Sequence, residues 1–361
     1  MDPGTITVRQ LSAMLFLFLA GGFDAFLPRY VAADAGGATL LSVGLATALA
    51  LIMVGVILRV ALRFSQSDVV QYSVAVWGSP LGQVAGTWYV LLLVFGAAQP
   101  LAGVGLIGNV AFGWWAAATP PLIFLLAVAC AVLAGQGLRK VARLSEYAAP
   151  AALIVGLIVG LAVLGKVNWT NFTMVPPGGW GPVWRGAVHL LGRFSLAYIL
   201  LLLVPFTKST RGIVQLTSVT ILAAGLMLGI EALPVGLYGA GAAATSFIPS
   251  LQLLSDSIFG ATPWFFDLAV GLWLLGLLFQ VVIAFQLLAT LLSQTAGTDP
   301  LRFLLPAGAA VAWTGLLLWT NAGGTYTFGE KYFQYLSFPA AIGIPLLLLP
   351  GLRMLWAGNR V

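Results

Sequence analysis

The chain has 361 residues, of which 60% are hydrophobic and only 7% are charged, and its formal net charge is +6. A water-soluble domain of this length exposes far more charge, so the composition excludes a soluble globular protein. With one cysteine (Cys130) and one histidine (His189), the chain lacks the ligands of a typical zinc site. No catalytic or phosphate-binding motif is present. The sequence therefore predicts no enzyme, no cofactor and no metal ion.

Ten apolar runs follow one another along the chain. Each approaches or exceeds the roughly 20 residues that a helix needs to cross a hydrocarbon core of roughly 30 Å. Helices are expected because backbone polar groups in lipid must bond within their own segment. The sequence thus predicts an all-α integral membrane protein of about ten transmembrane helices. The runs lie at about 8–31, 39–62, 81–109, 118–137, 147–165, 185–206, 212–238, 264–290, 302–321 and 332–356.

The first run is interrupted near its middle. Gly21 and Gly22 stand there, followed directly by Phe23 and Asp24. A lone charge at the bilayer centre costs roughly 2.5–3.5 kcal/mol, so Asp24 needs a partner or water. We expect the helix to unwind at about Gly21–Asp24.

Three connections are longer than the rest. Residues 64–80 predict a short helix that begins at Ser67 or Asp68 and ends at Gly78. Residues 166–184 and 239–263 lie on the opposite side of the membrane, and the second of these segments is expected to be re-entrant or to lie on the surface.

The sixth run is interrupted in the same way, at Gly192–Ser195. Glycine-broken helices at corresponding positions of two halves indicate a transporter-type binding site, since unwound backbone leaves polar groups free to bind solute. The predicted site consists of Gly21, Gly22, Phe23, Asp24, Gly192, Arg193, Phe194, Ser195 and Tyr198. Asp24 and Arg193 would either form a permanent ion pair or bind the ammonium and carboxylate groups of a zwitterionic solute. The aromatic residues would enclose the solute or simply pack.

Three further polar residues lie within runs. Glu231 is a candidate gate or proton site, or else an end-of-helix carboxylate that reaches solvent. His189 lies one turn from Arg193 and is a candidate titrating group, or a hydrogen-bonded packing residue. Gln280 would line a cavity or join two helices. We therefore keep these three as gating or ion-linked candidates.

The basic residues divide unequally between the two sides of the predicted membrane. By the positive-inside rule, the richer side and both termini are cytoplasmic. An excess of basic residues arranged in this way reports orientation and some attraction to anionic lipid, and it predicts no nucleic-acid partner. The richer side carries Arg9, Arg59, Arg63, Arg139, Lys140, Arg143, Lys208, Arg211, Arg302, Arg353 and Arg360, and the other side carries Arg29, Lys166, Arg185 and Lys331.

Several stretches together resemble the spore germination permease family, the integral B-type subunit of endospore germinant receptors. The most specific match runs from Gly137 to Glu146 with Pro150 behind it. The others are Thr5–Gln10 leading to Gly22 and Pro28, Trp77–Gly82, Thr119-Pro120, Phe194-Ser195, Pro205-Phe206 and Phe247–Pro249. The chain departs from the family pattern at Tyr198, where an acidic residue is expected, and at Asp24.

The resemblance implies the fold of the amino acid–polyamine–organocation superfamily. That fold has two inverted five-helix repeats, here about 8–165 and 185–356 within one domain of residues 1–361, with solute bound where helices 1 and 6 break. It also implies a bacterial spore inner or cell membrane protein that senses amino-acid-like germinants with partner subunits. The alternative is a working secondary transporter of amino acids or related solutes. The identity of the solute and of any coupling ion does not follow from the residues.

Overall fold

The computed structural model describes residues 5–21, 26–64, 67–113, 118–173, 179–257, 262–297, 299–320 and 333–349. Within these ranges the ordered elements are helices, apart from one isolated bridge between Ile6 and Thr207. Among the described residues, seven helical segments are long and apolar enough to cross a membrane, and three shorter apolar helices accompany them. Together they overlap all ten predicted runs, with Leu27–Arg63 reaching from the end of the first run through the second, so the predicted all-helical membrane fold is confirmed.

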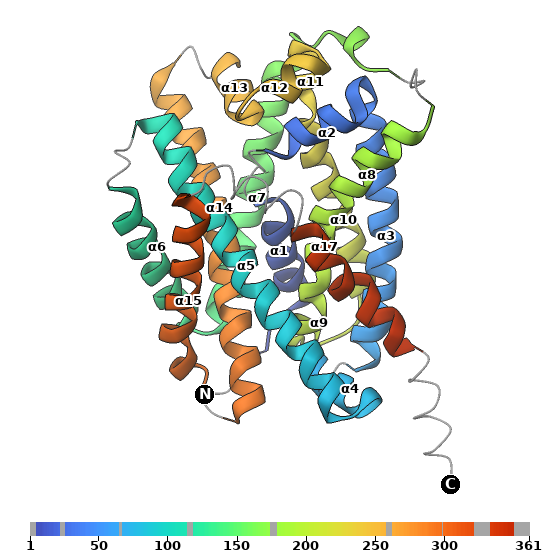
Figure 1. Ribbon diagram of the computed structural model, residues 1–361, viewed down its shortest axis with the longest axis vertical. Helices are drawn as coiled ribbons and strands as arrows, with labels where there is room; N and C mark the ends of the chain where they lie inside the picture. The colour runs from blue at the N-terminus through green and yellow to red at the C-terminus, as the bar shows by residue number, and fades with distance from the viewer. Residues whose placement is uncertain are drawn as a thin grey trace.

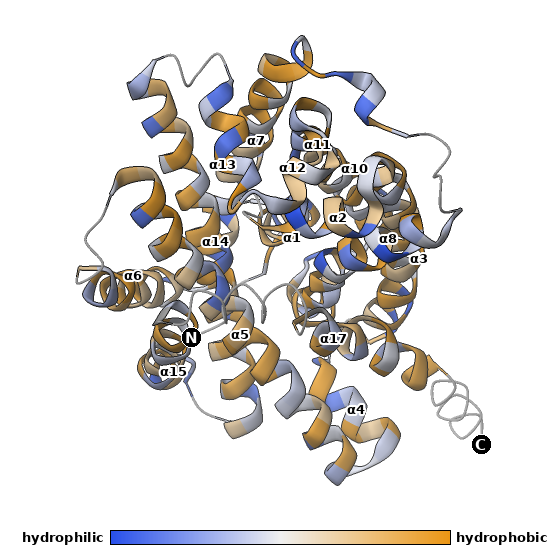
Figure 2. Cartoon of the chain, turned by 45° about the horizontal axis from the view of Figure 1, so that its top comes forward, coloured by the Kyte–Doolittle hydropathy of each residue, from blue (hydrophilic) through white to orange (hydrophobic). Residues whose placement is uncertain are grey.

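The helices pack as one bundle (Figure 1). α5 packs against α14 and α15, α3 packs against α8, and α1 contacts both α7 and α10. The long helices are coloured mainly as hydrophobic along their lengths (Figure 2). The spans comprise α1 (Val8–Ala20) with α2 (Leu27–Ala35), α3 (Thr39–Arg63), α5 (Ser79–Phe112), α6 (Thr119–Ala134), α7 (Leu138–Leu164), α8 (Gly181–Phe194) with η3 (Ser195–Ile199), α9 (Leu200–Leu203) and η4 (Val204–Phe206), α10 (Ile213–Glu231) with α11 (Leu233–Tyr238), α14 (Pro263–Ala296), α15 (Leu301–Thr320), and α17 (Phe333–Phe338) with the π-helical η6 (Pro339–Gly343).

Shorter elements connect the spans. The predicted helix of residues 64–80 is present as α4 (Val69–Trp77). Asp68 accepts a hydrogen bond from the Gln71 N–H, and the Gln71 side chain accepts one in return from the Asp68 N–H, so the two residues form a capping box. Gly78 ends the helix at φ 83°, a conformation that favours glycine. The remaining connecting elements are η1 (Gly36–Ala38), η2 (Trp169–Asn171), α12 (Ala240–Thr245) and α13 (Pro249–Asp256).

One end of the bundle, here called the basic end, brings together the start of α1, the start of α7 and residues 204–211. The Ile6 N–H donates to the Phe206 carbonyl at 2.8 Å, and the Lys208 N–H donates to the Ile6 carbonyl at 2.9 Å. Arg9 forms an ion pair with Glu146 at 3.1 Å. Segments far apart in the sequence therefore meet at the end where the basic loops cluster.

The opposite end, here called the far end, is covered by η2, α12 and α13. The Arg29 side chain donates to the Ala244 carbonyl at 3.0 Å, and the Lys166 ammonium donates to the Asp256 carbonyl at 2.6 Å. These contacts hold residues 239–257, a part of this connection that the structure describes, against the ends of the spans, where they form the two short helices α12 and α13.

The two predicted helix interruptions differ in form. α1 ends at Ala20, where the Gly21 N–H donates to the Leu17 carbonyl, and α2 begins at Leu27. In the sixth span, α8 instead continues as an α-helix through Gly192 and Arg193 and changes into the 3₁₀ helix η3 at Ser195. Glycine allows a break without requiring one, so the interruption here is a change of helix type at Ser195, the last residue of the predicted stretch.

Candidate functional site

The end of α1 lies against the last turn of α8. Arg193 Nε donates a hydrogen bond of 2.8 Å to the Leu19 carbonyl, which lies in the last turn of α1. A helix ends with carbonyl groups that lack helical partners and carry partial negative charge, so a guanidinium group is favourable there. The two interruptions are therefore joined directly, by a charged side chain and a backbone carbonyl.

The change from α8 to η3 is held by side-chain hydrogen bonds. Ser195 Oγ donates to the Gly192 carbonyl at 2.5 Å, a side-chain bond to the preceding turn that competes with the α-helical pattern. The same hydroxyl lies 2.5 Å from the hydroxyl of Ser337 on α17. Phe194 is buried directly before these bonds. Ser337 of the tenth span therefore helps to hold the transition from α-helix to 3₁₀ helix in the sixth span.

Tyr198 on η3 is completely buried, and among the described residues its hydroxyl has no hydrogen-bond partner. Its ring lies 5.8 Å from the ring of Tyr89 on α5, whose own hydroxyl donates to the Ala340 carbonyl at 2.8 Å. A Cβ atom placed on Gly96 would lie 3.7 Å from the Tyr198 hydroxyl and 3.9 Å from the ring of Phe18. A buried hydroxyl without a partner is costly, so Tyr198 is suited to bind a polar ligand group.

Some predicted site residues lie outside the described part of the chain. Gly22, Phe23 and Asp24 belong to this group, so the expected Asp24–Arg193 pair stays a prediction. Gly21 is described and forms the end of α1. A side chain there would clash with the Leu17 carbonyl, which explains the need for glycine.

His189 connects two helices near the far end. Its Nδ1 lies 2.6 Å from Asp34 Oδ2 on α2, and its ring stacks on Tyr30 at 5.9 Å. The structure thus places His189 beside a carboxylate that we did not single out from the sequence. The sequence does contain a signal for this contact, because Asp34 is an acidic residue in the short connection between the first run and the second.

Glu231 and Gln280 are both buried. Glu231 is 4% exposed and lies beside Leu27, Pro28 and Leu190, so the alternative that its carboxylate reaches solvent is wrong. Burial in the bundle follows because α10 continues past Glu231 into α11. Gln280 is 3% exposed, and its Nε2 has no partner among the described residues. The gating roles of both residues stay predictions.

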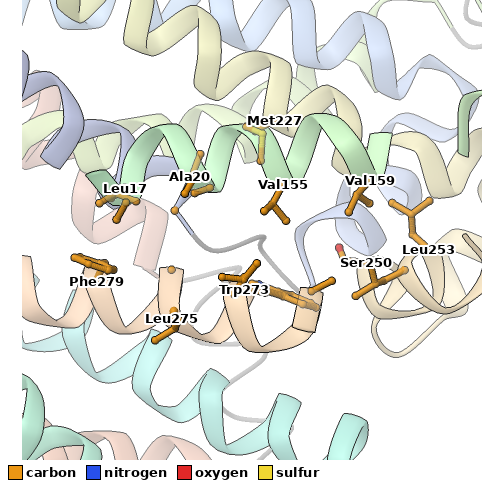
Figure 3. A pocket seen from close by; sticks show the side chains of 18 residues that line it. Leu17, Ala20, Val155, Val159, Met227, Ser250, Leu253, Trp273, Leu275 and Phe279 are labelled. Atoms are coloured by element: carbon orange, nitrogen blue, oxygen red, sulfur yellow. The ribbon is translucent and has the colours of Figure 1, made fainter. Parts of the chain in front are cut away.

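A cavity of about 200 Å³ lies between α1, α7 and α14, beneath α13. In Figure 3, Val155 and Val159 of α7 lie across the cavity from Trp273 and Phe279 of α14. Of the predicted site residues that are described, only Gly21 lines it. Its walls are almost entirely apolar and include no charged side chain from the described residues. The cavity is therefore separate from the contacts of Arg193, Ser195 and Tyr198.

The family model for spore germination protein matches residues 5–321. The chain belongs to this family. The match confirms the resemblance found in the sequence, and it covers both helix interruptions. Among curated protein sequences, none matches.

Solved transporter structures share the fold. MhsT in complex with L-phenylalanine superposes with a TM-score of 0.65 at 16% identity, covering 94% of this chain and 86% of that one. The Eremococcus coleocola manganese transporter gives 0.63 at 13% identity, covering 97% and 81%. Mhp1, a nucleobase-cation-symport-1 family transporter closed around bromovinylhydantoin, gives 0.63 at 13% identity, covering 98% and 95%. At these identities the likeness establishes a transporter fold.

Proposed function

We propose that this spore germination family member is a germinant receptor subunit that binds a small amino-acid-like solute between the end of α1 and η3. The observation that carries the proposal is the direct contact between the two helix interruptions, where Arg193 donates to the Leu19 carbonyl. Arg193 offers positive charge to a carboxylate, and the buried Tyr198 hydroxyl offers a further polar contact. The similarity to MhsT, whose structure holds L-phenylalanine, supports this solute class.

The remaining parts of the proposal concern the setting. The basic end would face the cytoplasm of a bacterial spore or cell membrane, with both termini on that side. The two repeats would span about 8–165 and 185–356 of one transmembrane domain. Other receptor subunits would be its partners, and the protein would bind its solute without chemical change, so it would not be an enzyme.

The test is amino-acid binding by purified protein in nanodiscs, measured as a thermal shift across the twenty amino acids. We expect at least one to raise the melting temperature, and Arg193→Met to abolish that shift. Arg185→Met is the matched control, because Arg185 lies on the same helix but is exposed. If Arg193→Met does not fold, Tyr198→Phe takes its place and should weaken binding roughly tenfold. Binding that survives both changes would contradict the proposed site, and the absence of any shift would contradict the solute class.

Counterflow of the labelled amino acid in proteoliposomes separates the receptor from a working transporter. The working transporter is tested because the structural relatives have a transporter fold. Binding without flux supports a receptor that senses its solute. Flux that Arg193→Met abolishes would instead identify a secondary transporter.

A further inference from the structure

The apolar cavity between α1, α7 and α14 has the character of a hydrocarbon-binding site. Of the described side chains that line it, only those of Ser250 and Trp273 contain an oxygen or nitrogen atom. A cavity of roughly 150 Å³ lined by hydrocarbon stays dry and accepts an apolar molecule, because a water molecule there lacks the two to four partners it needs. At about 200 Å³, this cavity has room for a short stretch of hydrocarbon chain.

The opening of the cavity faces lipid. Ala151, Leu272 and Leu275 line it and are also exposed on the outside of the bundle, with Leu275 52% exposed. They lie within the spans Leu138–Leu164 and Pro263–Ala296, beside exposed apolar side chains such as Ile158. Exposed apolar side chains within a span face the bilayer's hydrocarbon core. The cavity is thus continuous with the region that acyl chains occupy.

The floor of the cavity reaches residues that are otherwise inaccessible. Leu17 is 0% exposed and Met227 is 1% exposed, yet both line it. Leu17, Ala20 and Gly21 form the end of α1, where the first span is interrupted. Any group that fills the cavity therefore contacts this helix end directly.

The side chains of α7 at the opening of the cavity are small, so they leave a passage between α7 and α14. Ala148, Ala151 and Ala152 line the cavity on α7, across from α14. A zwitterionic solute would find no charged partner among the described lining residues, whereas an acyl chain requires none. We propose that a membrane phospholipid inserts the end of one acyl chain between α7 and α14, into this cavity and against the end of α1.

Photo-crosslinking tests the proposal directly. The intact protein is reconstituted with a phosphatidylglycerol that carries a diazirine near the end of one acyl chain, and adducts are mapped by peptide mass spectrometry. We expect adducts on Leu17 or Met227 in addition to the lipid-facing Leu161, which serves as the positive control. Leu15 is equally buried but does not line the cavity, so it should remain unlabelled.

A larger side chain in the passage between α7 and α14 should prevent the acyl chain from reaching the buried residues. We expect Ala152→Phe to reduce the Leu17 and Met227 adducts at least fivefold while labelling of Leu161 persists, and Ile154→Phe on the outer surface of the same helix to leave both unchanged. Ala148→Leu replaces Ala152→Phe if that variant does not fold. The proposal is overturned if Leu161 alone is labelled, if the filling variant leaves the buried adducts undiminished, or if added phenylalanine removes them, which would assign the cavity to the solute.

Discussion

At the scale of single residues, the polar side chains around the two interruptions differ in their bonding. Arg193 and Ser195 have backbone partners, and these bonds join α1, α8 and η3, while Arg193 also carries the charge that is proposed to bind a carboxylate. The Tyr198 hydroxyl has no partner among the residues described. Because an unpaired buried hydroxyl costs roughly 1–3 kcal/mol, its retention is better explained by ligand binding than by stability.

Replacement of Tyr198 by Phe separates these two roles. We expect unchanged or higher thermal stability, by up to about 1 kcal/mol, because no hydrogen bond to a described residue is lost, together with roughly tenfold weaker amino-acid binding. Tyr89→Phe is the control, since its hydroxyl donates to the Ala340 carbonyl and its loss should lower stability by about 1 kcal/mol. Thermal shift with and without amino acid measures both effects. A Tyr198→Phe variant with full binding would remove the hydroxyl from the site.

At the scale of elements, the close packing of two helices and the capping of a helix end determine where the helices lie. Gly186 lets α8 pack closely against neighbouring helices, because a Cβ there would lie 2.7 Å from the Ser42 hydroxyl and 2.9 Å from the Ala35 methyl group. α4 depends instead on Asp68 at its N-terminus. Glycine and a capping residue thus act locally to fix the positions of whole helices.

We expect Gly186→Ala to destabilise the protein by about 1–3 kcal/mol, because the added methyl group forces α8 away from Ser42 and Ala35. Gly55→Ala is the matched control. Gly55 lies in α3 with open space around it, so the helix propensity of alanine should stabilise that variant by up to about 1 kcal/mol. Melting temperatures in detergent would show the opposite signs. Equal changes in melting temperature for the two variants would contradict the close packing of α8 against Ser42 and Ala35.

Asp68 should make stability depend on pH. Burial raises the pKa of its carboxyl group above the ordinary 3.8, although hydrogen bonds from the backbone N–H groups of Gln71 and Val70 oppose the shift. The folded protein then holds the proton more tightly than the unfolded chain, so the contribution of Asp68 to stability falls as pH rises from 3.8 through the raised pKa.

Asp68→Asn retains an N-cap but removes the buried charge. We expect it to be at least as stable as the wild type at pH 7, with any advantage shrinking as pH falls through the raised pKa and gone below 3.8. Asp68→Ala should instead lose about 1 kcal/mol below pH 3.8, because the cap is gone, and less at pH 7, where the wild type bears the buried charge. Thermal melts between pH 3 and pH 7 measure both variants. A wild-type advantage over Asp68→Asn at pH 7 would show that the charged cap outweighs its burial.

At the scale of the whole molecule, the two ends of the bundle differ in charge. The basic end gathers the start of α1, the start of α7 and the loop that carries Lys208 and Arg211, whereas the far end is covered by short helices. An unequal distribution of basic residues sets the orientation of a membrane protein, since basic loops remain on the cytoplasmic side.

Cysteine labelling tests this orientation. In a Cys130→Ser background, an impermeant maleimide added to intact cells should label Thr170→Cys but not Thr210→Cys, because these exposed residues lie at the far end and the basic end respectively. Permeabilised cells should label both, which controls for reactivity. Labelling of Thr210→Cys alone in intact cells would invert the orientation, and labelling of both would contradict the arrangement of spans.

Sequence patterns predicted the helices well because their cause is local. A run of apolar residues must form a helix in lipid wherever it lies, and Asp68 and Gly78 mark the bounds of α4 by their own capping preferences. The interruption after Gly21 follows equally from the glycines. In the sixth span the α-helix continues to Phe194 and changes only at Ser195, the last residue of the predicted stretch. This position depends on bonds to Gly192 and to Ser337, the second of which lies more than a hundred residues away.

By itself, the sequence determined that this protein is a bundle of membrane helices with two interrupted spans, and its motifs identified the family. Apolar length and helix breakers act through short-range physics, so a linear chain reveals them. Only the tertiary structure decided that Arg193 binds the end of α1, that His189 contacts Asp34, and that an apolar cavity opens between α7 and α14. These features arise where helices distant in sequence pack together, and a packing geometry cannot be read from the residues of one helix.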